Sequence, residues 1–547
     1  MEQFTESERS IISQFCTNTD KPVFALVNLP EVVCGALFSR YSRSTKSLRR
    51  VLLDEFINNP ETGFAEVAKF AAGSGNSALV STRKAEEFYE RVLVGYGDDS
   101  VAELGGAHLA VEDVSNIATK VMQDARIGVS PLEKSTRYVH FNQKTDGKYR
   151  YLREERIMQS PFADEYTSAM DLLFDTYSKL NEPLTNAMQE KYPNESQASE
   201  RAYASSIRAK VCDMLRCLLP ASTLTNTGLY GNGRAFEYML LRMHASPLSE
   251  IKATAEGMQS ELNLVIPSFV RRANDKYGQA TQQYMNETNA TVKKTLASYE
   301  LTENASARPN AAGDATGVEL VHYDSDAENK VLAAILFEHS EKSLAQLYSL
   351  AQKMPKEEKE KILLAYMGGR ANRRQKPSRA FENAHYCFSL CGNFGMYRDL
   401  HRHRILTQFR QPLSTQHGFE MPHELIEYGH EKEVREAVET AASLQVRMKE
   451  KMPLESQYAV PMGYRLRWYM NMNLREAYHF IELRSMPQGH IDYRRMVQQM
   501  YLKIKNVHPV FASGMKFVDM SEGGLERLDA EKKTDKKLEE LKKKYGH

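Results

Sequence analysis

Two arginines flank one histidine at Arg402-His403-Arg404, and these residue types together could hold an anion beside a titratable ring. An arginine guanidinium stays protonated and forks onto phosphate or carboxylate oxygens. A histidine can donate, accept or titrate near neutral pH. The triplet therefore predicts a site for a polyanionic ligand that carries a redox or acid–base centre.

A second segment, SPLEKSTRY at residues 130–138, stands at the matching place in the first half of the chain. It offers the carboxylate of Glu133, the hydroxyl of Ser135 and the guanidinium of Arg137. A serine acts as a nucleophile only beside an activating base. No such base is evident, so hydrogen bonding is the favoured role of Ser135.

These segments resemble the flavin-dependent thymidylate synthases, whose signature is close to RHRxxSxNExSxRY. The run RHRILT at 402–407 is similar to its front half, and residues 130–138 are similar to its back half. Neither copy is whole. The first half of the chain reads DAR at 124–126 where the triplet belongs, and the second half has Gln416 and His417 in place of the final Arg and Tyr.

Other runs carry the same resemblance. The family has a helix with a run like "hflelR", and NLREAYHFIELR at 473–484 is close to it, while GRAFEYMLLR at 233–242 is a looser copy. An SxxE element precedes the signature in the family. Residues 100–103 resemble that element, and residues 379–382 keep only its acid, Glu382.

The resemblance implies reductive methylation of dUMP, or a related pyrimidine nucleotide, to give dTMP. Methylenetetrahydrofolate would give the carbon and FAD, reduced by NADPH, the hydride. Protein groups position such a cofactor. It also implies an α+β fold in which helices surround a short antiparallel sheet. The implied catalytic residues are Arg402, His403, Ser135 and Arg484. The implied cofactor-binding residues are Arg402, His403, Arg404 and Glu382. The implied substrate-binding residues are Glu133, Ser135, Arg137, Arg242 and Arg484.

Landmarks recur at fixed spacing in the two halves. Arg242 precedes Pro267 by 25 residues, and Arg484 precedes Pro509 by the same number. An acid also follows each arginine after eight residues. Such self-similarity predicts a tandem duplication. We expect a first repeat at 20–275, a linker at 276–316, a second repeat at 317–520 and a charged tail at 521–547.

One repeat keeps the front half of the signature and the other keeps the back half. The sequence therefore predicts a fused pseudo-dimer in which the two halves make one composite site. Self-association would then give a pseudo-tetramer from a dimer of chains.

Composition excludes several classes. The chain has 547 residues with 72 basic and 71 acidic side chains, a balance that argues against general nucleic-acid binding. No run of about 18 apolar residues predicts a membrane span, and the acidic, polar beginning MEQFTESERS is no signal peptide. The six cysteines lack disulfide spacing, which favours reduced thiols in a cytoplasmic protein. Arginines beside His401 and His403 disfavour a metal, so none is expected.

Apolar spacing also predicts individual elements. Helices are expected at 101–123, 233–244, 251–266, 382–400, 473–485 and 493–507, with short strands at 23–29 and 317–323. Two alternatives to thymidylate synthesis stay open. The chain could be a catalytically inactive flavin- or nucleotide-binding homologue, or a flavoenzyme that modifies another pyrimidine nucleotide.

Overall fold

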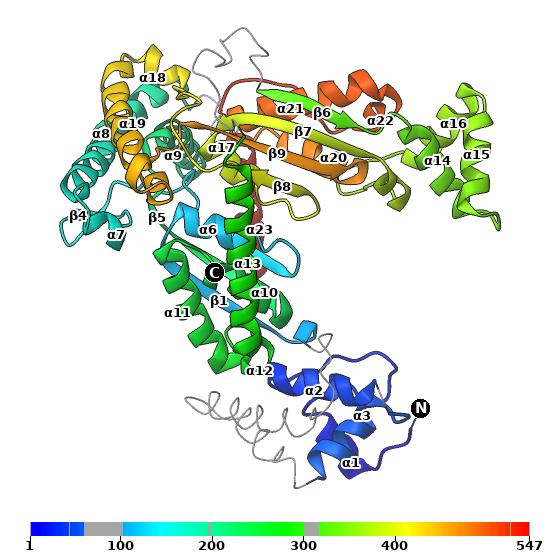
Figure 1. Ribbon diagram of the computed structural model, residues 1–547. Coiled ribbons are helices and arrows are strands. Elements are labelled where there is room, and N and C mark those ends of the chain that lie inside the picture. The colour runs from blue at the N-terminus through cyan, green and yellow to red at the C-terminus, as the bar shows by residue number, and fades with distance from the viewer. Residues whose placement is uncertain are drawn as a thin grey trace. The chain divides into compact units, whose positions relative to one another are not determined.

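The computed structural model of the chain describes residues 2–42, 44–59, 102–194, 198–299, 317–525 and 527–545 (Figure 1). The chain forms two compact units. Unit 1 comprises Met1–Val114, Ala118–Glu133 and Thr225–Glu300, and unit 2 comprises Ser115–Ile117, Lys134–Leu224 and Leu301–His547. The predicted repeat boundaries are a different division of the chain and stay a prediction.

Both units combine helices with antiparallel strands. The elements up to the middle of the chain are α1 (Glu6–Ile12), α2 (Glu31–Tyr41), α3 (Leu48–Val51), β1 (Gly106–Ser115), α6 (Asn116–Gln123), β2 (Val129–Glu133), β3 (Lys144–Thr145), β4 (Lys148–Tyr149), α7 (Glu155–Met158), α8 (Ala163–Lys191), α9 (Glu200–Leu215), β5 (Leu224–Asn232), α10 (Gly233–His244), α11 (Ser249–Val265), α12 (Pro267–Val270) and α13 (Lys276–Leu296).

The remaining elements belong to unit 2. They are β6 (Val318–Tyr323), α14 (Ala327–Phe337), α15 (Leu344–Lys353), α16 (Lys356–Met367), the 3₁₀-helix η7 (Arg379–Asn383), β7 (His385–Asn393), α17 (Phe394–Leu400), β8 (Thr407–Arg410), α18 (His423–Glu427), α19 (Glu431–Lys451), β9 (Arg465–Asn473), α20 (Leu474–Arg484), α21 (Ile491–Val507), α22 (Pro509–Ser513) and α23 (Leu528–Tyr545).

Each unit contains one main sheet. In unit 1 the strand order is β1-β5-β2, and β5 runs antiparallel to β2. In unit 2 the order is β6-β7-β9-β8, with every neighbouring pair antiparallel (Figure 1). The central strand is β5 in the first sheet, and β9 pairs with both β7 and β8 in the second. The structure therefore has the mixed helix and sheet composition that the resemblance implied.

An asparagine links strand to helix at three places. Asn232 ends β5 and accepts the backbone N–H of Ala235 at 2.8 Å, which caps α10. Asn393 caps α17 after β7, and Asn473 caps α20 after β9, in the same way. A side-chain oxygen at this position satisfies a backbone donor that the helix leaves unpaired. The strand-to-helix step is thus fixed locally, and in unit 2 it sets the start of the two helices that carry the site.

Aromatic packing fixes the buried face of α20. Tyr478 lies in the interior with its ring 5.5 Å from that of Phe381, and Phe381 lies 5.5 Å from Phe511 of α22. Such edge-to-face pairs add stabilisation beyond the area that they bury. Away from Tyr478, the helix carries the polar residues Glu476, His479 and Arg484 beside the buried Phe480.

A reciprocal backbone contact lies inside unit 2. Pro220 and Pro461, which precede Arg242 and Arg484 by 22 and 23 residues, form an isolated antiparallel bridge. Ala221 N donates to Val460 O at 2.8 Å, and Met462 N donates to Leu219 O at 2.8 Å. The two bonds are equivalent, because each residue lies 241 positions from its counterpart: the donors are Ala221 and Met462, and the acceptors are Leu219 and Val460. A second such couple joins Ser222 N to Tyr458 O and Gly463 N to Cys217 O. This reciprocity is what a two-fold axis between equivalent segments produces.

The sequence predicted four helices well and two poorly. Helices α10, α11, α20 and α21 confirm the expected segments within a few residues. Residues 101–123 and 382–400 were expected to be wholly helical, which is wrong. Strands β1 and β7 occupy most of the first part of each segment, and only α6 and α17 are helical. Cys387 and Cys391 therefore lie on a strand, and all six cysteines are free thiols.

The short strand predicted at 317–323 is confirmed as β6, whereas 23–29 forms only a bridge between Cys16 and Leu26. Prolines at 22 and 30 flank that run, and proline cannot donate to a sheet. The start of the expected linker is a helix, α13, and most of the tail is the helix α23, which buries no residue. Residues 300–316 lie outside the described part of the chain, as do Ser100 and Val101.

Candidate functional site

The Arg402-His403-Arg404 triplet follows the end of α17 in unit 2. Gln408 holds the turn by donating its side-chain N–H to His401 O at 2.8 Å. His403 is buried, whereas Arg402 and Arg404 are exposed. The backbone thus turns the imidazole inward and leaves the two guanidiniums near the surface.

His403 bonds to α20 through both ring nitrogens. Nδ1 lies 3.0 Å from Glu476 Oε1, and Nε2 accepts from Arg484 Nε at 2.8 Å. Burial, followed by the charge of Arg484, holds the pKa of His403 well below its usual value. The ring is therefore neutral at pH 7, and because Nε2 accepts, the proton is on Nδ1. His403 orients Arg484 and donates to Glu476.

The partners of His403 are also perturbed. Burial raises the pKa of Glu476 to about 7, and burial with the charges of Lys376 and Arg373 lowers the pKa of His479 to about 4. Ligand atoms of His403, Glu476 and His479 lie within 4.8 Å of one another, a spacing that could hold a cation. Arg484, Arg373 and Lys376 surround them with positive charge, which disfavours a metal.

Arg137, from the back half of the signature, is buried in the same unit. Its Nε and Nη2 donate to the two carboxylate oxygens of Asp213, each at 2.6 Å. Its Nη1 donates to the hydroxyl of Tyr493 at 3.3 Å. The guanidinium of Arg484 lies 5.9 Å from the centre of the Tyr493 ring. The structure therefore brings Arg137, Arg484 and His403 into one network around Tyr493.

Asp399 ties Arg402 to this network. Its two oxygens accept from Arg216 at 2.8 Å and from Arg402 at 2.7 Å. Burial opposes the charge of Asp399, but Arg216 and Arg402 hold the pKa of the carboxyl well below its usual value. The Arg402 side chain remains 39% exposed, so part of its guanidinium can meet a ligand.

The other predicted residues have the following places. Ser135 accepts the backbone N–H of Arg137 at 3.2 Å, which shapes the turn. Glu382 accepts from Arg475 at 3.2 Å in unit 2. In unit 1, Glu133 pairs with Lys120 at 2.8 Å, and Arg242 donates to the carbonyl of Asp124 at 3.3 Å. Glu133 and Arg242 thus belong to the other compact unit.

Five members of the network were not predicted from the sequence: Asp213, Arg216, Asp399, Glu476 and Tyr493. Glu476 follows a predicted helix start and Asp399 precedes the triplet by three residues, so spacing offered a weak signal for both. Asp213 and Tyr493 meet Arg137 across 76 and 356 residues, and no local pattern identifies such partners.

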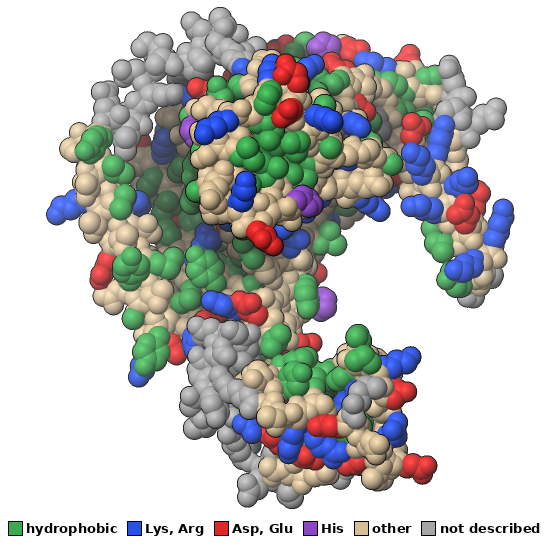
Figure 2. Space-filling model, turned by 90° about the vertical axis from the view of Figure 1, so that its right-hand side faces the viewer, with side chains coloured by type: hydrophobic (Ala, Val, Ile, Leu, Met, Phe, Trp, Pro, Cys, Tyr) green, Lys and Arg blue, Asp and Glu red, His purple; other side chains and the backbone are tan. Residues whose placement is uncertain are grey.

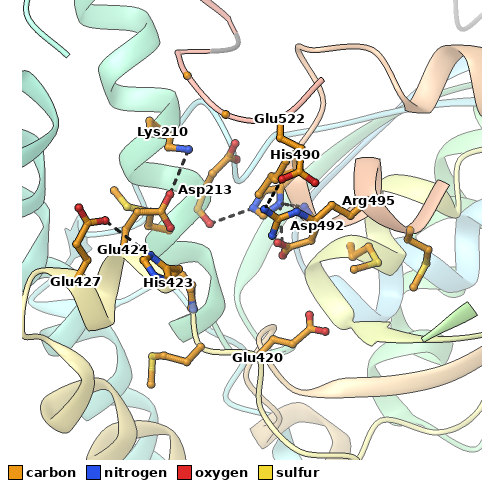
Figure 3. Close-up of a pocket in the computed structure, with 18 of the residues that line it drawn as sticks. Lys210, Asp213, Glu420, His423, Glu424, Glu427, His490, Asp492, Arg495 and Glu522 are labelled. Carbon is orange, nitrogen blue, oxygen red and sulfur yellow. Dashed lines mark hydrogen bonds and ion pairs between the residues drawn. The ribbon is translucent and has the colours of Figure 1, made fainter. Parts of the chain in front are cut away.

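A cavity of about 960 Å³ lies in unit 2, and Asp213 and His490 line it (Figure 3). Side chains from α9 and α18 line one side, and those from the start of α21 line the other. Asn393 donates to both Glu420 and Asp492, which it holds together. Burial and the neighbouring Asp492 raise the pKa of Glu420. Asp213 also holds Arg137, so the acidic partner of that ion pair borders the cavity.

The face displayed in Figure 2 carries Lys and Arg side chains interspersed with Asp and Glu, in line with a formal net charge of +1. Among the described residues, no helix is long and apolar enough to cross a membrane.

Comparison with known proteins places the chain among related sequences. A UPF0159 protein of Chlamydia pneumoniae is 43% identical over 536 residues, which is 98% of each chain. One from Chlamydia muridarum is 43% identical over 96% of this chain and 98% of its own. One from Thermoplasma acidophilum is 34% identical over 91% and 97%.

Among solved structures, one match is the UMP/dUMP methylase PolB from Streptomyces cacaoi bound with 5-Br dUMP. The match covers 37% of this chain and 94% of the PolB chain, with 18% identity and a TM-score of 0.29. The family model described as thymidylate synthase complementing protein matches residues 52–268 and 319–510, two successive segments. This match confirms the resemblance seen in the sequence, and the chain belongs to the thymidylate synthase complementing protein family, with two divergent copies in tandem.

Proposed function

We propose that the protein is an FAD-dependent thymidylate synthase that methylates dUMP to dTMP, with methylenetetrahydrofolate as carbon donor and NADPH as reductant. Family membership over both segments supports this reaction class. The observation that carries the site is the meeting of the two signature halves. Arg137 from one and His403 from the other are joined through Tyr493 and Arg484 in unit 2.

The residues present fit an anionic dinucleotide. Arg402 is partly exposed and Arg404 is exposed, so both can fork onto phosphate oxygens. Glu382 holds Arg475, which lies on the same helix as Arg484. FAD, when bound, supplies the hydride, while the protein supplies position and charge.

Arg484 is the proposed contact to the pyrimidine nucleotide. Its Nε is committed to the neutral His403, so the Nη groups are what a nucleotide would meet. Glu476 accepts the His403 Nδ1 proton and, with a pKa of about 7, can hold a proton of its own near neutral pH. His403 and Glu476 therefore act by positioning Arg484 and by setting the local charge.

The tandem copies would form a pseudo-dimer inside one chain, and two chains would form a pseudo-tetramer. The reciprocal backbone bonds around Pro220 and Pro461 support this arrangement. One composite site per chain, in unit 2, is the expected number.

The test is reconstitution of the purified protein with FAD, followed by release of tritium from [5-³H]dUMP in the presence of methylenetetrahydrofolate and NADPH. Arg402→Gln and Arg137→Gln should each abolish turnover and weaken binding of the same ligand, either FAD or dUMP. If one variant lost the binding of FAD and the other lost the binding of dUMP, the result would contradict a composite site.

A second candidate is an inactive homologue that binds flavin or nucleotide. Its support is Asp213, which already occupies two N–H groups of the buried Arg137 that the resemblance assigns to the nucleotide. Bound FAD without tritium release would favour it. Turnover of UMP but not dUMP in the same assay would favour an enzyme acting on another pyrimidine nucleotide.

A further inference from the structure

A cationic loop lies between α16 and η7 in unit 2. Residues 368–378 read GGRANRRQKPS and contain Arg370, Arg373, Arg374 and Lys376. Arg370 is buried, Arg373 is partly exposed, and Arg374 and Lys376 are exposed. One cation is thus used inside the protein and three remain at the surface.

Two contacts tie the loop to α20. Arg370 donates through Nη1 and Nη2 to the carboxylate of Glu482, at 2.7 and 2.5 Å. Arg475 Nε donates to the carbonyl of Pro377 at 2.9 Å. Arg475 and Glu482 are seven residues apart and therefore lie on one face of the helix, two turns from each other. The loop is held along the helix that also carries Glu476, His479 and Arg484.

The loop is ordered by its own side chains. Gln375 Oε1 accepts from the backbone N–H of Ala371 at 2.5 Å, and Asn372 Oδ1 accepts from that of Arg374 at 3.0 Å. Side-chain-to-backbone bonds of this kind stabilise tight turns. The exposed cations therefore sit on a preformed turn, so little order has to be created when they bind a ligand.

The positive charge of the turn has no acidic partner there. Among the residues that the structure describes, Arg373, Arg374 and Lys376 form no ion pair within 4.0 Å. The two acids of α20 are already used, since Glu476 bonds to His403 and Glu482 to Arg370. The low pKa of His479, to which Lys376 and Arg373 contribute after burial, is consistent with their lying beside α20.

We propose that the turn at 371–376 is a diphosphate-binding element of the flavin site, with Arg373 and Lys376 as contacts in addition to Arg402 and Arg404. The proposal rests on the proposed function, because the triplet at 402–404, which bonds to the same helix through His403, is taken as part of the flavin site. A preformed cationic turn that lacks acids suits an organic diphosphate, since arginine forks onto phosphate oxygens and lysine adds a point charge.

The test compares three flavins that carry two, one and no phosphate groups, of which FAD also carries adenosine. Dissociation constants of FAD, FMN and riboflavin are measured by fluorescence titration for the wild type and for the double variant Arg373→Gln/Lys376→Gln. FAD should bind about 10- to 100-fold more weakly to the variant, because each charge-assisted bond contributes about tenfold in affinity. FMN should lose less and riboflavin nothing, and the salt dependence of FAD binding should become shallower.

The matched control is Lys361→Gln/Lys449→Gln, which removes the same charge from exposed positions of α16 and α19. It should leave all three affinities unchanged, and both variants should keep the melting temperature of the wild type. Unchanged FAD affinity in the loop variant, or equal losses for FAD and riboflavin, would overturn the assignment while leaving the proposed function intact. If the loop variant instead binds only NADPH more weakly, the loop belongs to the reductant site, and the assignment to FAD is overturned as well. Wild-type protein that binds no flavin would refute both proposals.

Discussion

The buried charged residues of this site are stabilised by pairing with residues of opposite charge. Arg137 and Asp213 are both largely buried, and each is the main compensation for the other. Removing one partner of a buried pair leaves an unpaired charge that costs about 3–5 kcal/mol, whereas removing both costs less. The pair therefore sets the stability of unit 2 as well as its ligand chemistry.

Arg137→Gln should lower the free energy of unfolding of unit 2 by about 3–5 kcal/mol. The double variant Arg137→Gln/Asp213→Asn should recover part of that loss. Trp468, the chain's single tryptophan, is buried in β9 of unit 2, so its fluorescence during urea unfolding reports on this unit. Additive losses in the double variant would show that the two groups do not compensate each other.

Glu476 makes stability depend on pH. Its folded pKa of about 7 is above the usual 4.5, so the folded state holds a proton that the unfolded state releases. The resulting stabilisation is present below pH 4.5 and is lost as pH rises through 7. Between pH 4.5 and 8, the wild type should lose up to about 3 kcal/mol relative to Glu476→Gln. Unfolding curves at both pH values measure this, and parallel pH profiles would contradict the shift.

The residues of the signature could be picked out from the sequence, but the network could not. Arg402, His403 and Arg137 stand in recognisable runs. Tyr493, which joins them, lies on a helix whose local pattern reports only amphipathicity. Two residues that meet only in the folded protein show no local sequence pattern that identifies them as partners.

At the scale of elements, α20 is the organising helix. It bonds to His403 through Glu476 and Arg484 and to the cationic loop through Arg475 and Glu482. Tyr478, which lies between Arg475 and Glu482 on the face that holds the loop, packs against Phe381. A shift of this helix would move the triplet and the loop together.

Arg370→Met should release the loop from α20 while keeping an apolar side chain of similar length. Glu482 would lose its partner, and the variant should be less stable by about 3–5 kcal/mol. Trypsin should then cleave after Arg373 or Arg374 at least tenfold faster than in the wild type, which mass spectrometry of the fragments can time. Lys361→Gln, on α16, serves as the control. Unchanged cleavage would show that Arg370 does not hold the loop.

Helices that are amphipathic over their whole length, such as α10 and α20, were predictable because the 3.6-residue period is uninterrupted. The errors at 101–123 and 382–400 have one cause. In each, a strand runs directly into a helix, and the apolar residues of both merge into one pattern. The pairing of β7 with β9 is set by residues about 80 positions away, and a window of local sequence does not contain that information.

At the scale of the molecule, unit 2 is assembled from separated stretches. Helix α8, which precedes the bridge at Pro220, packs against α19 from the second half of the chain. Residues that the sequence assigns to the first repeat therefore complete the core of the unit that carries the triplet. The family segments in the sequence and the folding units need not coincide.

A fragment that begins at residue 317 should consequently fail to fold. It would lack α8 and α9 and would expose the apolar face of α19, including Val434 and Leu444, which are fully buried in the complete chain. We expect aggregation or a flat thermal melt. Adding residues 134–224 on a separate chain should restore a cooperative transition and the emission spectrum of Trp468. A cooperatively folding fragment alone would contradict this account.

The bonds between Cys217–Ser222 and Tyr458–Gly463 run from main chain to main chain. They make few demands on side-chain identity, so substitutions beside them are compatible with the same contact. In an assembly of identical chains, every substitution appears twice and a damaged motif is damaged everywhere. In the proposed pseudo-dimer of one chain, each substitution would appear in one copy only, so either copy could lose what the other retains.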